Sequence, residues 1–216
     1  MRITVIGATG MIGSEVTAEA ARRGHDVTAA SRHPTPSRHP ADTAPVRVTS
    51  VAVDAGDRAA VKALLAAADV AVLAVRPAPG QEDTLPQVTR TVLDAGAATR
   101  TRILVVGGSG PLWSHDRAGL LVVDDPDRVP PAYRAIALAS ARQLQACKAH
   151  DGTDWTYLSP PAEIGPGERT GTFRRGTDTL LTAADGQSRI SVQDFAIAAI
   201  DELEHSTGMP HITVAY

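Results

Sequence analysis

Three glycines near the start of the chain have the spacing of a phosphate-binding turn. Gly7, Gly10 and Gly13 follow an apolar run at residues 3–6 and lead into residues 14–23, which predict a strand and a helix respectively. In such a unit the first glycine permits a tight turn, the second lets the backbone approach a pyrophosphate, and the third lets the helix pack closely. The positive N-terminus of the helix would then face the phosphates. We therefore predict a dinucleotide site here, contacted by Gly7, Thr9, Gly10, Met11, Ile12 and Gly13.

A basic residue follows the second predicted strand, at residues 25–31, and bears on the choice of cofactor. Sites that prefer NAD usually place a carboxylate at this point to accept hydrogen bonds from the ribose hydroxyls, whereas this chain has Arg32. A guanidinium can pair with a 2′-phosphate, so we predict NADPH as the cofactor. The alternative is that Arg32 is a solvated loop residue. Arg38 could help only if the proline-rich loop at residues 32–45 folds over the adenosine.

Further candidate residues follow the third and fourth predicted strands, at residues 46–53 and 70–75. Ligands lie outside the carboxyl ends of the strands in an open parallel sheet, so these residues are expected to contact the cofactor. Asp54 is placed to accept a hydrogen bond from the adenine amino group, with the backbone of Ala55 assisting. The adenosine ribose and pyrophosphate are expected to run beside Ala74, Val75 and Arg76. Arg76 could equally be a plain surface cation.

The fifth and sixth predicted strands, at residues 102–106 and 155–158, end in turns suited to the nicotinamide end of a dinucleotide. Gly107 and Gly108 would let the backbone approach the nicotinamide ribose, and Ser109 would present a hydroxyl where the redox chemistry occurs. Backbone groups for the carboxamide are expected from Pro160, Pro161 and Ala162. Ser109 is a candidate catalytic residue that forms a hydrogen bond, since no histidine or lysine in these motifs is positioned to make it a nucleophile. Its alternative role is that of a turn residue between glycines.

Strands and helices alternate over the first 158 residues, and these elements must position the candidate residues. The alternation predicts an α/β fold, with a single Rossmann-like, doubly wound parallel sheet. After the first helix, further helices are expected at residues 58–68, with Asp57 as N-cap, and at 84–98 and 131–150.

The remaining residues, 159–216, are expected to form a small C-terminal cap over the carboxyl edge of the sheet, together with the last sheet elements. The pattern predicts a hairpin at 171–190, a helix at 192–204 and a final strand at 211–215. We therefore expect one NAD(P)-binding domain over residues 1–216, whose Rossmann core is 1–158.

The composition excludes several classes of protein. A formal net charge of −3 over 216 residues gives no general attraction to nucleic acid or to an anionic membrane surface. No run approaches the roughly 18 apolar residues of a membrane span, and the first strand begins too early for a signal peptide. Cys147 is the single cysteine, which agrees with a reducing cytoplasm. We expect a cytoplasmic monomer or small homo-oligomer that holds no metal and binds a small-molecule acceptor.

In combination, these motifs resemble those of the atypical short-chain dehydrogenase/reductases. The resemblance is closest to the branch that holds NmrA-like NAD(P)-binding proteins and flavin reductases of the biliverdin reductase B type, and it runs essentially end to end. It is carried by the glycine turn, Arg32, Asp54, the Ser109 loop, the Pro160–Pro161 turn, and the segments 129–131 and 189–194. The glycine motif alone is shared by a very wide superfamily, so only the combination identifies the branch.

Two departures from this resemblance bear on the chemistry. Typical short-chain dehydrogenases use a Tyr-x-x-x-Lys pair, whose lysine lowers the pKa of the tyrosine for proton exchange with an alcohol or ketone. Here Ala137 stands four residues after Tyr133, and Leu144 stands four residues before Lys148. Alcohol oxidation, sugar epimerisation and dehydration by that mechanism are therefore not expected. The biliverdin reductase B type also has a histidine directly after its two prolines, where this chain has Ala162.

The sequence leads to two hypotheses about function. The first is an NADPH-dependent reductase that transfers a hydride to a planar conjugated acceptor of the flavin, quinone or tetrapyrrole type. Such an acceptor delocalises the incoming charge and can take its proton from water, which suits a chain without an acid/base pair. The alternative is an NmrA-like redox sensor that binds NADP(H) without turnover. The residues that could line a substrate pocket, or else belong to the core or the surface, are Trp113, Tyr133, Glu163 and Phe173.

Overall fold

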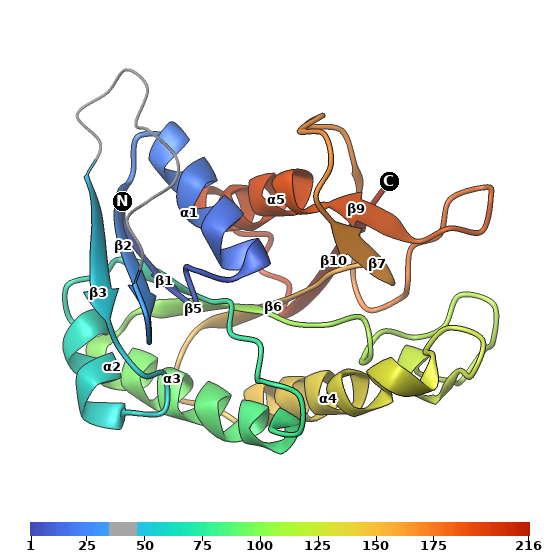
Figure 1. Ribbon diagram of the computed structural model, residues 1–216, viewed down its shortest axis with the longest axis horizontal. Helices are drawn as coiled ribbons and strands as arrows, with labels where there is room; N and C mark the ends of the chain where they lie inside the picture. The colour runs from blue at the N-terminus through green and yellow to red at the C-terminus, as the bar shows by residue number, and fades with distance from the viewer. Residues whose placement is uncertain (35–46) are drawn as a thin grey trace.

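An eight-stranded, mostly parallel sheet lies at the centre of the protein (Figure 1). The computed structural model describes residues 1–34 and 47–216. In these ranges the strand order is β3-β2-β1-β4-β5-β6-β10-β8, and only β8 runs antiparallel to its neighbour. The strands are β1 Arg2–Ile6, β2 Asp26–Ser31, β3 Val48–Ala52, β4 Val70–Leu73, β5 Arg102–Val106, β6 Trp155–Ser159, β8 Arg174–Gly176 and β10 His211–Ala215. The predicted α/β fold with a Rossmann-like sheet is confirmed.

The chain reverses its direction across the sheet between β1 and β4. It moves outward from β1 through β2 to β3, then crosses back and places β4 on the other side of β1. Ile3 of β1 pairs in register with Val27 of β2 and with Val70 of β4. Ligands of open α/β sheets bind at such a reversal, outside the carboxyl ends of the strands. The topology therefore directs the search for a site to the turns that follow these strands.

Helices cover both faces of the sheet (Figure 1). On one face α1 (Met11–Arg22) packs against α5 (Val192–Glu204). The other face carries α2 (Arg58–Leu65), α3 (Leu85–Thr99) and α4 (Arg134–Lys148). Every residue of β4 is buried, because both faces of this strand meet a helical layer. The core therefore has two large apolar layers, one on each side of the sheet, and a small third cluster of Leu112, Val122 and Leu180.

The ends of several elements differ from the predicted ones. Helix α1 begins at Met11 rather than at residue 14, so that its first turn lies directly after Gly10. Helix α4 begins at Arg134, because Pro131–Tyr133 form a short 3-10 turn. Asp57 caps α2 as predicted, since its Oδ1 accepts hydrogen bonds from two backbone N–H groups of the first turn, both at 3.0 Å.

The hairpin predicted at residues 171–190 is wrong. Strand β8 pairs with β10, whereas β9 (Arg189–Ser191) pairs in parallel with β7 (Glu163–Gly165) in a small second sheet. Each strand finds its partner far away in the sequence, and alternation along the chain carries no signal of such pairing. The C-terminal tail also does more than form a cap, because α5 and β10 belong to the central layers.

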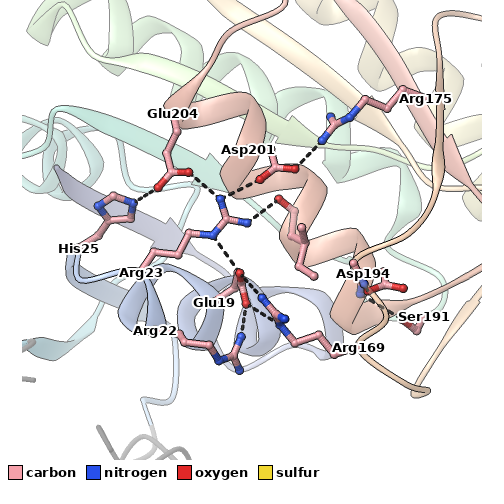
Figure 2. A network of polar contacts seen from close by, with 12 residues as sticks. Glu19, Arg22, Arg23, His25, Arg169, Arg175, Ser191, Asp194, Asp201 and Glu204 are labelled. Atoms are coloured by element: carbon pink, nitrogen blue, oxygen red, sulfur yellow. Dashed lines mark hydrogen bonds and ion pairs between the residues drawn. The ribbon is translucent and has the colours of Figure 1, made fainter. Parts of the chain in front are cut away.

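A buried carboxylate ties the tail to the first helix (Figure 2). The side chain of Glu19 on α1 is 2% exposed and pairs with three arginines. Arg169, from the segment between β7 and β8, donates to both carboxylate oxygens at 3.1 and 2.9 Å. Burial opposes the ionisation of Glu19, but the hydrogen bonds from Arg169 and Arg23 outweigh it and lower the pKa of the carboxyl. Arg23 also donates to Asp201 on α5, so one network joins both helices and the tail.

A second buried carboxylate holds the end of the chain. Asp194 on α5 accepts hydrogen bonds from the Thr170 hydroxyl, the Gly171 N–H and the hydroxyl of Tyr216. Burial opposes its ionisation, and these three donors together lower the pKa of the carboxyl. Ser191 caps α5 by accepting from the Asp194 N–H at 3.0 Å. Through its hydrogen bond to Asp194, Tyr216, the residue that follows β10, is held beside the small second sheet.

The last parallel strand of the sheet, β10, contains a buried histidine. His211 of β10 is 7% exposed, and its ring lies edge-on to Tyr157 of β6, with 5.4 Å between the ring centroids. Its Nε2 is 2.9 Å from the hydroxyl of Ser159. Burial, reinforced by the positive charge of Lys148 and opposed by Asp178, lowers the pKa of His211 to about 4. The imidazole is therefore neutral in the folded protein near neutral pH.

We expect the stability of the protein to fall as the pH drops below about 6.5, partly through His211. In the unfolded chain His211 takes up a proton near the ordinary histidine pKa of 6.5. In the folded protein it stays neutral until the pH falls to about 4. The resulting loss is about 2 kcal/mol of unfolding free energy by pH 5. Urea unfolding of the wild type and of His211→Gln at pH 8, 6 and 5 measures it. The difference between the two proteins should shift by that amount in favour of the glutamine variant. A constant difference across this range would contradict the lowered pKa.

Candidate functional site

In the turn after β1, the backbone of Gly7 packs against the backbone of Ala74, where the strand order of the sheet reverses. Gly7 has a φ of +93°, which side chains other than glycine rarely permit, and a Cβ there would lie 2.3 Å from the carbonyl oxygen of Ala74. A Cβ on Gly13 would lie 2.2 Å from the Gly7 carbonyl oxygen. The first glycine is thus required by both the turn and the neighbouring strand, and the third by close packing of α1, as the motif predicts.

The N-terminus of α1 at this turn has the properties of an anion site. Gly10 is the N-cap residue, and because it lacks a side chain it forms no side-chain cap. The first turn contains no acidic residue, so its N–H groups and the positive end of the helix dipole are not neutralised locally. Thr9, Gly10 and Met11 are exposed, and Ile12 is half-buried. Donors of this kind fit the pyrophosphate of a dinucleotide.

A buried hydroxyl without a partner follows, at the end of β2. The Ser31 Oγ has no hydrogen-bond partner in the described part of the chain, although the residue is only 7% exposed. Its neighbour Arg32 is exposed. A buried unpaired hydroxyl is costly, so this position favours a ligand that can pair with it. Sequence reasoning selected Arg32 and passed over Ser31, because the burial of a strand-end serine cannot be read from the chain. Arg38 lies outside the described residues.

The predicted adenine contacts lie in an Asx-type turn after β3. Asp54 is exposed, and its Oδ1 accepts from the Gly56 N–H at 2.8 Å, which leaves the other carboxylate oxygen for a ligand. Ala55 is buried beneath it. After β4, Val75 is half-buried and Arg76 is exposed at the same edge of the sheet. The contacts of these residues with a cofactor stay predictions.

The glycines after β5 serve a packing role that the sequence did not indicate. A Cβ on Gly107 would lie 2.1 Å from the ring of Tyr157, and one on Gly108 would lie 2.9 Å from the side chain of Ser140 on α4. Close approach of β6 and α4 therefore requires glycine at both positions, whatever lies on the solvent side. Ser109, the next residue, is half-buried, and no described residue pairs with its hydroxyl. That hydroxyl is free to meet a ligand at the edge of the sheet.

The turn after β6 is partly used by the protein itself. Pro160 and Pro161 are buried, and the N–H of Ala162 donates to the Ser188 hydroxyl at 3.2 Å. This N–H is therefore engaged within the protein. Glu163, the next residue, is exposed and lines an open cavity of about 460 Å³ between the small second sheet and the segment that follows β7. Tyr216 lines the same cavity.

The three aromatic residues predicted as pocket walls lie in different surroundings. Trp113 is 43% exposed, and its backbone is fixed by hydrogen bonds to Asp178 and Leu180. Tyr133 is 58% exposed at the start of α4. Phe173 packs against the core layer of α1 and α5, with the guanidinium of Arg175 over its ring. Trp113 and Tyr133 thus offer apolar surface to a ligand, whereas the half-buried ring of Phe173 packs against the core.

Tyr157, which sequence reasoning did not select, cannot replace the missing acid/base pair. It is completely buried, and burial raises its pKa far above the ordinary value. Its hydroxyl donates to the Ser140 carbonyl at 2.9 Å and also contacts Gln143. Within the described residues, no three His, Cys, Asp or Glu side chains gather as metal ligands. No helix in the same ranges is both long and apolar enough to span a membrane.

Comparison with known proteins identifies the family. A family model described as NAD(P)H-binding matches residues 7–203. The "Uncharacterized protein YwnB" of Bacillus subtilis (strain 168) is 36% identical over 207 residues, which cover 95% of this chain and 93% of that protein. A solved "Putative exported protein" from Burkholderia pseudomallei is 38% identical, with a TM-score of 0.87 and 100% of both chains covered. A solved "putative NADH-flavin reductase" from Streptococcus pneumoniae TIGR4 is 28% identical, with a TM-score of 0.88 and 100% and 99% covered. The chain therefore belongs to this family of NAD(P)H-binding proteins.

Proposed function

We propose that this protein is an NADPH-dependent reductase whose acceptor is a planar conjugated molecule of the flavin, quinone or tetrapyrrole type. One observation carries the proposal. A turn suited to anions lies at the same edge of the sheet as the turn after β5, which has few polar side chains; we call the part of the edge at Ser109 the reaction edge. The N-terminus of α1 fits a pyrophosphate, yet the turn after β5 offers only the Ser109 hydroxyl. The similar Streptococcus pneumoniae protein, named a "putative NADH-flavin reductase", supports an acceptor of the flavin type.

The work of the chain in such a reaction is mainly orientation. NADPH supplies the hydride when it is bound, and a conjugated acceptor spreads the resulting charge over its own ring system. The glycine turn and α1 hold the pyrophosphate, and Ser109 hydrogen-bonds the nicotinamide or the acceptor. The exposed faces of Trp113 and Tyr133 provide apolar surface on which a planar ring can rest. Correct placement of two rings can supply a large part of the rate enhancement without an acid or a base.

Steady-state oxidation of NADPH with FMN, FAD, biliverdin and simple quinones tests the proposal. At saturating cofactor we expect turnover with at least one of these acceptors. Absence of turnover with all of them would contradict it. In that case a marked difference in affinity between NADP⁺ and NADPH would favour the alternative function, a redox sensor, which the missing Tyr-x-x-x-Lys pair also fits.

Cofactor choice is proposed to depend on Arg32. Arg32→Ala should weaken NADPH binding by about 1.5 to 3 kcal/mol, the value of a charge-assisted hydrogen bond, and should leave NADH binding almost unchanged. Fluorescence titration with both cofactors measures this. Arg90→Ala, which removes an exposed arginine on α3, is the charge-matched control and should not discriminate between them. Equal affinity of the wild type for NADH and NADPH would contradict the assignment of Arg32 to the 2′-phosphate.

Ser109 is proposed to act at the reaction edge through a hydrogen bond. Ser109→Ala should lower kcat by about tenfold to a hundredfold, equivalent to about 1.4 to 2.7 kcal/mol, and should keep NADPH affinity within a few-fold of the wild type. The pyrophosphate contacts are untouched, so only the chemical step should respond. Ser206→Ala, beyond the far end of α5, serves as the control. An unchanged kcat would contradict this role and indicate that Ser109 is a turn residue.

A further inference from the structure

Side chains of β6 contact both peptide groups that flank the Cα of Gly108. The Ser159 Oγ donates to the Gly108 carbonyl oxygen at 2.9 Å, in the peptide between Gly108 and Ser109. In the preceding peptide, the Gly108 N–H donates to the hydroxyl oxygen of Tyr157 at 3.4 Å. Tyr157 is itself fixed, because its ring lies directly under Gly107 and its hydroxyl is bonded to α4. We call Ser159 and Tyr157 the Gly108 clamp.

The hydrogen-bond directions extend the clamp to the next strand. Ser159 has a single hydroxyl proton, which it donates to Gly108. The 2.9 Å contact between Ser159 Oγ and His211 Nε2 therefore requires the histidine to be the donor. This fixes the neutral Nε2–H tautomer of His211. A directed chain results, in which His211 donates to Ser159 and Ser159 donates to the carbonyl of Gly108.

The clamp counters the flexibility of the turn that presents Ser109. Gly107 and Gly108 are glycines for packing reasons, and glycine restricts its own backbone less than any other residue. The peptide plane between Gly108 and Ser109 contains the Gly108 carbonyl, and its orientation limits where the Cα–Cβ bond of Ser109 can point. The hydrogen bond from Ser159 restrains this plane and therefore narrows the directions open to the Ser109 hydroxyl.

We propose that His211 and Ser159 are positioning residues that hold the peptide between Gly108 and Ser109 and thereby direct the Ser109 hydroxyl toward the carboxyl edge of the sheet. Their effect on turnover rests on the proposed function, whereas the clamp itself is a property of the folded chain. His211 lies on β10, in register with Tyr157 of β6. A residue more than 100 positions from Ser109 in the sequence would thus contribute to its placement.

Two measurements on the protein alone test the clamp. Nitrogen-15 NMR of wild-type His211 at pH 7 should show a protonated Nε2 and an unprotonated Nδ1. Amide hydrogen exchange over residues 107–110 should accelerate at least tenfold in Ser159→Ala and His211→Leu. His211→Gln keeps an N–H donor near the position of Nε2 and should exchange like the wild type. The opposite tautomer, or equal exchange in all variants, would overturn the proposal.

A matched control separates the clamp from general loosening of the strands. Thr213→Val removes a buried hydroxyl that donates to the Ser159 carbonyl oxygen at 2.9 Å, between the same two strands, without touching Gly108. It should leave exchange over residues 107–110 unchanged. An acceleration equal to that of Ser159→Ala would show that the effect is not specific and would overturn the proposal.

Turnover provides the functional readout. His211→Leu and Ser159→Ala should lower kcat by about threefold to tenfold with KM for NADPH within twofold, and His211→Gln should restore kcat. Adding Ser159→Ala to Ser109→Ala should cause no further loss, because the residue being positioned is already absent. Additive losses would overturn the positioning role. An inactive wild-type protein would contradict the proposed function alone, since the tautomer and exchange measurements need neither cofactor nor acceptor.

Discussion

The contact between the first turn and the fourth strand is the constraint on which the site depends. The backbone of Gly7 approaches that of Ala74 so closely that no side chain fits between them, and Gly13 meets Gly7 in the same way. These two contacts bring β1, β4 and α1 together at the point where the sheet reverses its order. The positive end of α1 therefore lies at the carboxyl edge of the sheet, where the turns after the other parallel strands also end. A helix end suited to a phosphate is thus a direct result of packing between glycine backbones.

Buried ionic groups hold the rest of the chain around this edge. Glu19 joins α1 to the segment after β7, and Asp194 joins α5 to that segment and to Tyr216. Both carboxylates keep a lowered pKa despite burial, because several donors surround each of them. Removing a single partner of such a group is expected to be costly, since it leaves a buried charge without compensation. The tail is therefore attached by specific pairs as well as by apolar contact.

The buried tyrosine of β6 has a structural role in this chain. Tyr157 is buried, has a raised pKa, and uses its hydroxyl to support α4 and the turn after β5. Its role is to support the backbone of that turn, since a buried hydroxyl with a raised pKa is poorly suited to proton transfer. The turn after β5 is held by hydrogen bonds to Gly108, and the polar side chain that this turn presents is that of Ser109. Such a turn suits an acceptor that needs orientation more than acid or base.

The sequence by itself determined the strands, the helices and the candidate turns of the parallel core. The signals for these features are local: apolar runs, a glycine spacing of three, the Asp57 cap and the absence of a tyrosine–lysine pair. Only the tertiary structure decided the pairing of β7 with β9 and of β8 with β10, because these partners are distant in the sequence. It also decided why Gly107 and Gly108 are glycines, and that Ser31 is buried without a partner. The link from His211 to Ser109 depends on the register between β6 and β10, and register is fixed by packing rather than by residue pattern.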